Sequence, residues 1–170
     1  NDRPCAFRYP RGTGLGSTLP SITEKIEIGK SKIIKEGKKL AILNFGARLS
    51  ETLKDAENLL KKGVPITVVD ARFAKPLDEN LIWQLATTHE AIMTIEEGSI
   101  GGFGSHVVNF LTKKGLMDSN LKFRSLTLPD IFIDQDTPDK MYKVANLDSV
   151  SIEEKVLDLL NSNIVLKKQN

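Results

Sequence analysis

Two arginines near the start of the chain are the residues whose types and spacing best suit chemistry. Arg8 and Arg11 precede a run in which Gly12, Gly14 and Gly16 alternate with other residues. A guanidinium group presents a planar fork of donors to phosphate or carboxylate oxygens, and glycines let backbone N–H groups approach an anion. The segment therefore suits an anionic ligand. Its glycine spacing matches neither the dinucleotide fingerprint nor the P-loop, so these residues alone favour a surface linker with ordinary ion pairs.

A pair of adjacent glutamates, Glu96 and Glu97, follows an apolar stretch that ends at Ile95. Two carboxylates could serve as a general acid and base or as metal ligands. Neighbouring side chains on an extended chain point to opposite sides, however, and no histidine follows at ligand spacing. We therefore expect a structural or interface role for the two glutamates.

The stretch after these glutamates is rich in glycine and predicts a loop against which another backbone can pack closely. Its glycines are Gly98, Gly101, Gly102 and Gly104, and His106 stands just inside the helix expected after them. This histidine could be catalytic, but a hydrogen bond at an interface is the favoured interpretation.

The single cysteine, Cys5, cannot form an internal disulfide, which suggests a reducing compartment. Neither histidine, His89 or His106, lies near it in sequence. We therefore expect Cys5 to be a small buried apolar residue rather than a nucleophile. Trp83 and Met93 fall on apolar patterns and are expected in the core.

Composition sets the class of protein. The 170 residues allow one ordinary domain with a sizeable core, and 40% hydrophobic with 27% charged residues is typical of a globular protein. No apolar run approaches the ~20 residues that span a bilayer, so we expect no membrane insertion. A net charge of +2 with 6% aromatic residues does not indicate a nucleic-acid partner.

Apolar runs alternate with helical periods along most of the chain. Residues 26–34, around Gly29, are expected to form a short strand pair or a bent strand that ends at Gly37. Buried strands are predicted at 40–45, 66–69, 91–95 and 123–128, and helices at 49–60, from an N-cap at Asp78 to Leu85, at 107–111, from an N-cap at Thr137 to Asn146, and from a capping box at Ser151 to Leu160. Strands joined by crossover helices predict an α/β fold with a mostly parallel sheet covered on both faces.

The start of the chain, which lacks Met, looks like a piece of something longer. Cys5 to Tyr9 could be a strand of a preceding domain, followed by a linker. We accordingly expect residues 1–21 to be the end of a preceding domain plus linker, 22–161 to be the main domain, and 162–170 to be a disordered tail.

Six segments of the chain, in this order, closely resemble the 1-deoxy-D-xylulose-5-phosphate synthases. They are Arg8–Gly12, Leu40–Gly46, Asp70–Asp78, Thr94–Gly98, Gly101–Ser105 and Leu128–Ile133. The resemblance covers Ala6 to about Leu160, and it implies the end of the pyrimidine-binding domain plus a transketolase C-terminal-type domain, with three α/β/α layers and a five-stranded sheet. Transketolases and the β chains of 2-oxo acid dehydrogenases have a similar last domain, but Arg8–Gly12 combined with Leu128–Ile133 favours the synthases.

This resemblance implies a thiamine diphosphate and Mg²⁺ enzyme that condenses pyruvate with D-glyceraldehyde 3-phosphate and releases CO₂. Its product enters isoprenoid, thiamine and pyridoxal synthesis. Arg11 is implied to contact the phosphate of the acceptor triose. The family's cofactor ligands and catalytic residues belong to regions outside this chain, so no catalytic or metal-binding residue is expected in it, and it is expected to bind no cofactor alone.

The same resemblance implies a homodimer completed by N-terminal and central domains, with the loop from Glu96 to His106 buried against a second copy. A bacterial cytoplasm is the expected location, with a plastid-like organelle as the other setting. Two alternatives stay open. The chain could be a stand-alone, non-catalytic interaction or regulatory domain of the same fold, or it could come from the β chain of a 2-oxo acid dehydrogenase.

Overall fold

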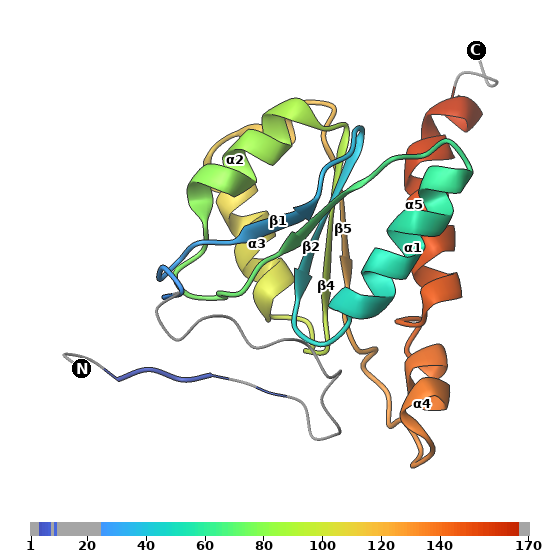
Figure 1. The fold of residues 1–170 in the computed structure, drawn as a ribbon. Helices are drawn as coiled ribbons and strands as arrows, with labels where there is room; N and C mark the ends of the chain where they lie inside the picture. Colours follow the sequence, from blue (N-terminus) through green and yellow to red (C-terminus); the bar gives the residue numbers. More distant parts are fainter. Residues whose placement is uncertain (1–3, 8, 10–24, 167–170) are drawn as a thin grey trace.

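The computed structural model describes residues 4–7, 9 and 25–166, without the side chains of 161–166. Its centre is a five-stranded sheet in the order β1-β3-β2-β4-β5. The strands are β1 (Lys32–Lys35), β2 (Leu40–Phe45), β3 (Thr67–Asp70), β4 (Ala91–Glu96) and β5 (Lys122–Leu126). β1 pairs antiparallel with β3, whereas the other pairs are parallel (Figure 1). The predicted mostly parallel sheet is thus confirmed.

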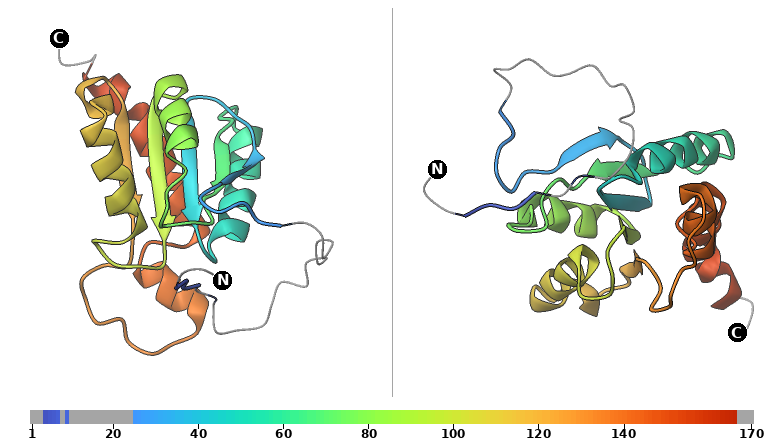
Figure 2. Two further views of the ribbon diagram at one scale, coloured as in Figure 1. Left: turned by 90° about the vertical axis from the view of Figure 1, so that its left-hand side faces the viewer. Right: turned by 90° about the horizontal axis from the view of Figure 1, so that it is seen from below.

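Helices cover both faces of this sheet. Their bounds are α1 (Leu49–Lys61), α2 (Glu79–Thr88), α3 (Phe103–Lys113), α4 (Pro138–Val144) and α5 (Ser149–Leu166), with a short 3₁₀ turn, η1 (Leu116–Asp118). α1 and α5 lie on one side of the sheet, and α2 and α3 lie on the other (Figures 1 and 2). The arrangement has the three α/β/α layers that the resemblance implied. In the described part of the chain, no helix is long and apolar enough to cross a membrane.

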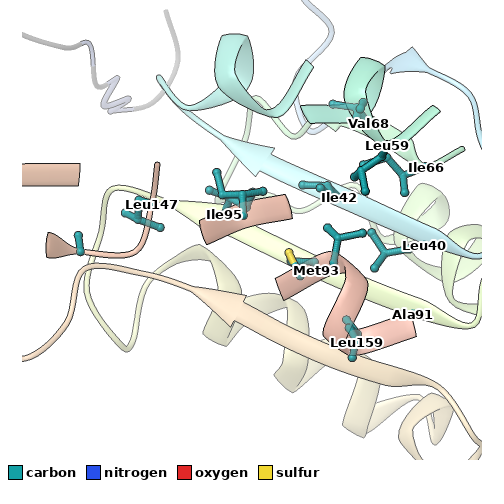
Figure 3. Packing of buried hydrophobic residues seen from close by; sticks show 14 residues of the cluster. Leu40, Ile42, Leu59, Ile66, Val68, Ala91, Met93, Ile95, Leu147 and Leu159 are labelled. Carbon is teal, nitrogen blue, oxygen red and sulfur yellow. The ribbon is translucent and has the colours of Figure 1, made fainter. Parts of the chain in front are cut away.

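The two central strands bury both of their faces. Leu40 and Ile42 of β2 pack with Met93 of β4 under α1 and α5 (Figure 3). The intervening residues Ala41 and Ile92 pack on the other face, under α2 and α3. Continuous apolar runs are what a parallel strand covered on both sides requires. The prediction that Met93 belongs to the core is confirmed.

Local signals position several helix ends as expected. The Asp78 carboxylate accepts a hydrogen bond from the Leu81 amide at 3.1 Å, and its other oxygen accepts from the Ser31 amide at 2.9 Å. Gly63 follows α1 with a φ of +78°, a conformation that favours glycine, and Asn146 follows α4 with a φ of +55°. The first of these caps also ties α2 to the segment that enters β1.

Other boundaries differ from the predictions. α5 begins at Ser149 rather than at Ser151, because Asp148 is the more effective N-terminal residue: it accepts the Ser151 hydroxyl at 2.5 Å, and its carbonyl accepts the Ile152 amide at 3.0 Å. α5 also continues to Leu166, into the segment expected to be a tail. Thr137 precedes α4 but makes no side-chain capping bond.

Three further expectations were wrong. Trp83 is 52% exposed, because α2 turns Ile82, Leu85 and Ala86 toward the sheet and leaves the intervening position outside. Cys5, expected to be buried, is exposed. Around Gly29 only β1 forms, and Ile26 and Ile28 are exposed.

Candidate functional site

The carboxyl edge of the sheet is the candidate functional site. Strands β2, β3 and β4 all end there, which brings together the segments Asn44–Gly46, Asp70–Arg72 and Glu96–Gly98. The chain also enters β1 at this edge, because Lys32 pairs with Asp70. Loops at this edge of open parallel sheets are the usual place for ligands.

Glu96 is a buried carboxylate that holds the start of α3. It is 2% exposed, and its two oxygens accept hydrogen bonds from the Phe103 amide at 3.0 Å and the Gly104 amide at 2.9 Å. A negative charge at a helix N-terminus also meets the positive end of the helix dipole. A side chain at Gly102 would collide with this carboxylate. Glu96 therefore anchors the start of α3.

Glu97 points the other way, toward α4, as the extended geometry predicted. Its Oε1 lies 3.2 Å from Nε of Arg48 and accepts the Tyr142 hydroxyl at 2.5 Å. The Arg48 guanidinium carbon lies 3.5 Å from the centroid of the Tyr142 ring, which is a close cation–π contact. Burial raises the pKa of Tyr142, and the hydrogen bond to Glu97 raises it further. These three side chains, the Arg48 cluster, join the N-terminus of α1, the end of β4 and α4.

Asn44 stiffens the turn between β2 and α1. This side chain is fully buried, donates to the Gly46 carbonyl at 2.9 Å and accepts the Thr52 hydroxyl at 3.1 Å. Its backbone carbonyl accepts the Ala71 amide at 2.9 Å, so the ends of β2 and β3 are held together.

Arg72 follows β3 in a left-handed conformation, with a φ of +57°, which is uncommon for a residue other than glycine. Its Nε lies 3.4 Å from Oδ2 of Asp70, and the Ser31 hydroxyl holds the neighbouring Ala71 carbonyl at 3.1 Å. Arg48, Arg72 and Tyr142 were not predicted as site residues. The available signal was that Arg48 and Arg72 lie in the loops that follow β2 and β3.

The predicted interface segment forms one continuous loop at this edge. Gly98 accepts the Leu128 amide through its carbonyl at 2.8 Å, so the loops after β4 and β5 lie together. Ile100 is exposed, as are Ile131 and Phe132 beyond β5. His106 is half-buried in the first turn of α3 and lines a hollow of about 200 Å³ with Lys75 and Lys113. Contact of this loop with a second copy stays a prediction.

Arg11 lies outside the described residues, as do Arg8 and the glycines after it. Its assignment to a phosphate therefore stays a prediction. The described residues do not fit a magnesium and diphosphate site: the oxygens of Glu96 and Oε1 of Glu97 are occupied by internal partners, and residues 4–7, 9 and 25–166 contain no group of three or more potential metal ligands. What these residues can do is fix the edge of the sheet and present it to a neighbour.

A mostly parallel five-stranded sheet between two layers of helices, with anchoring groups at its carboxyl edge, defines an α/β/α domain. Residues 29–152 match the family described as "Transketolase, C-terminal domain", and the chain belongs to that family. Members of the family generally use thiamine diphosphate and a divalent metal.

Solved structures agree with this assignment. A split-gene transketolase, described as an inactive β4 tetramer, is 27% identical, with a TM-score of 0.74 over 85% of this chain and 46% of that one. The transketolase of Campylobacter jejuni subsp. jejuni is 15% identical, with a TM-score of 0.55 over 76% of this chain and 18% of that one, and shows the fold alone. The chain thus spans less than half the length of either structure.

Proposed function

We propose that this chain is the C-terminal part of a 1-deoxy-D-xylulose-5-phosphate synthase, a transferase that joins pyruvate to D-glyceraldehyde 3-phosphate with loss of CO₂. The observation that carries the proposal is the combination of Arg8–Gly12 with Leu128–Ile133 in a chain of the transketolase C-terminal family. The second segment follows β5, at the same edge where the chain enters β1.

Within such an enzyme, thiamine diphosphate supplies the carbanion chemistry from domains outside this chain. The contribution proposed for this chain is to bind and orient the acceptor. In this proposal Arg11 presents its guanidinium fork to the triose phosphate.

The proposal includes partners. The chain covers 46% of the split-gene transketolase, which supports the proposal that N-terminal and central domains complete the active enzyme. We also propose that two copies meet through the loop from Glu96 to His106 and its neighbour after β5. The related tetramer is described as inactive, which supports the expectation that this chain alone neither binds the cofactor tightly nor turns over pyruvate.

The test is selective loss of the phosphorylated acceptor. In the enzyme completed with its other domains, Arg11→Ala should reduce kcat/KM for glyceraldehyde 3-phosphate by roughly 10- to 150-fold, the equivalent of about 1.5 to 3 kcal/mol for a charge-assisted hydrogen bond. Arg11→Lys should recover only part of the loss, because it keeps the charge and lacks the fork. The measurement is steady-state kinetics at saturating pyruvate.

Two controls make this result decisive. Unphosphorylated D-glyceraldehyde should react with Arg11→Ala and wild-type enzyme at similar kcat/KM. Arg124→Ala, at an exposed arginine of β5, should leave both acceptors unchanged. Equal losses for the two acceptors in a normally folded Arg11 variant would contradict the phosphate assignment.

A second candidate is the C-terminal subunit of a split transketolase, and the 27% identity to that protein over 85% of this chain favours considering it. The two candidates differ in the donor. A synthase releases labelled CO₂ from carboxyl-labelled pyruvate, whereas a transketolase moves a two-carbon unit from a ketose phosphate and releases none. Assay of the completed enzyme with each donor separates them.

A further inference from the structure

The Arg48 side chain is largely buried, but only part of its guanidinium group is engaged by the residues around it. Its side chain is only 15% exposed. Nε lies 3.2 Å from Glu97, yet this buried atom makes no directed hydrogen bond. In the part of the chain that the structure describes, no acceptor is bonded to its two terminal amino groups. Nε is the Arg48 atom that is buried without a hydrogen bond, whereas the two terminal amino groups are not among the buried atoms and so can reach an acceptor from outside the chain.

The guanidinium is also held in one orientation. The Tyr142 ring packs on its face at 3.5 Å, and Glu97 attracts it at Nε. The Tyr142 hydroxyl donates to the same Glu97 oxygen at 2.5 Å, which fixes the ring relative to the carboxylate. With its face and its Nε side engaged, the end of the fork formed by the two terminal amino groups is left for another acceptor. Such a fork matches the spacing of two oxygens of one carboxylate or phosphate.

We propose that Arg48 is the core of a small-oxyanion binding site at the carboxyl edge of the sheet, with Glu97 and Tyr142 as the residues that position its guanidinium. The ligand is a carboxylate or a phosphate group that receives two parallel N–H hydrogen bonds from the terminal amino groups. The site is separate from the role proposed for Arg11, and it does not depend on the identity of the enzyme.

The experiment is an NMR titration of the uniformly ¹⁵N-labelled 170-residue chain, following the Arg48 Nε–H signal. Inorganic phosphate is one probe and acetate is the other, each added at constant ionic strength with chloride as the balancing ion. We expect a saturable shift with a millimolar dissociation constant. The probe with the lower constant identifies whether phosphate or carboxylate is the preferred class.

Variants test the assignment. Arg48→Gln should weaken binding at least roughly 10-fold, followed through backbone amides of the loop after β2, since it removes the charge and the fork. Arg124→Gln is the matched control: it removes an exposed arginine whose Nη1 bonds to the Phe123 carbonyl, and it should bind as wild type does. Tyr142→Phe should keep most of the affinity, because the ring remains, whereas Tyr142→Leu should lose it.

Arg48→Lys serves if Arg48→Gln fails to fold by circular dichroism, and it should bind more weakly than wild type because a lysine lacks the fork. A shift that grows linearly with both probes would overturn the proposal. Equal affinities for wild type and a folded Arg48 variant would do the same.

Discussion

The carboxyl group of Asp55, in α1, is fully buried where α1 packs against α5. One of its oxygens accepts the Ser149 hydroxyl, while Oδ2 is buried and has no hydrogen-bond partner in the described part of the chain. Burial raises the pKa of Asp55 from 3.8 to about 6, against the opposing effect of Ser149, and the nearby Glu51, Glu153 and Asp148 raise it further. The folded chain therefore holds this proton more tightly than the unfolded chain does.

We expect this carboxyl group to make the chain more stable on mild acidification. Between pH 4 and pH 6 the folded state binds more protons than the unfolded state at this position, so the free energy of unfolding should fall as the pH rises. The full effect is at most about 3 kcal/mol. Urea unfolding of the wild-type chain and of Asp55→Asn across this range measures it, and the variant should lose the trend.

His89 provides an internal comparison of opposite sign. Its Nε2 lies 2.8 Å from the Thr67 hydroxyl and its Nδ1 lies 2.9 Å from that of Thr88, and burial lowers its pKa. A depressed histidine pKa costs stability as the pH falls below 6.5. Asp55→Asn should therefore retain a loss of stability on acidification. An unchanged gain in this variant would show that Asp55 is not its source.

At the scale of single residues, the sequence allowed predictions wherever a side chain's environment is set by its immediate neighbours. Glu96 and Glu97 were expected to point to opposite sides because they are adjacent on an extended strand, and they do. Arg48 and Tyr142 could not be paired in advance, because their contact depends on how α4 returns across the edge of the sheet. Arg11 lies outside the described residues and remains a prediction.

At the scale of elements, the close approach of α3 to the sheet depends on Gly104. A Cβ atom at this position would collide with the Ser125 hydroxyl oxygen and would lie 2.6 Å from the Thr94 hydroxyl oxygen. These two hydroxyl groups are hydrogen-bonded to each other at 3.0 Å. Glycine-to-alanine changes inside helices normally stabilise by up to about 1 kcal/mol. Here we expect Gly104→Ala to destabilise the chain by about 1 to 3 kcal/mol, because overpacking outweighs helix propensity.

Thermal or urea unfolding of Gly104→Ala tests this prediction. Asn109→Ala, at an exposed position of the same helix, is the control and should leave stability unchanged or raise it slightly. A stabilised Gly104→Ala variant would mean that α3 can move away from β4 and β5 at little cost.

Elements with both faces buried were the easiest to predict. The range 40–45 was expected as a strand and is β2, and 91–95 differs from β4 by one residue. At the ends of helices and strands, competing local signals decided where each element begins. Asp148 starts α5 earlier than the capping box at Ser151 suggested, and β1 takes only the part of the isoleucine-rich segment that can pair with β3.

At the scale of the whole molecule, exposed apolar residues gather on the two loops that the Gly98–Leu128 hydrogen bond joins. Ile100, Ile131 and Phe132 lie there, and apolar groups of this kind mark interaction surfaces. Following the proposal of a second copy at this edge, we expect self-association that rises with concentration. Replacing both Ile131 and Phe132 by Asp should abolish it, as measured by sedimentation velocity over a concentration series.

Trp83→Ser removes another large exposed side chain, one that lies on α2, and should leave the association unchanged. A wild-type chain that stays monomeric at all concentrations would contradict the prediction.

The fold and the transketolase family could be inferred from the sequence because the βα pattern and the motifs span most of the chain. The particular enzyme could not be settled in the same way, since it depends on the acceptor-binding segment and on domains outside the chain.

The two outer strands of the sheet bear on whether the protein aggregates at high concentration. β1 and β5 leave backbone groups along their outer sides, which in other proteins can recruit further strands and start aggregation. β1 has only four residues, carries Lys32 and Lys35 and shifts register between Ile33 and Lys35, while β5 carries Lys122 and Arg124. Like charges and an interrupted ladder discourage edge-to-edge stacking, so both open sides of the sheet are protected against pairing with further strands.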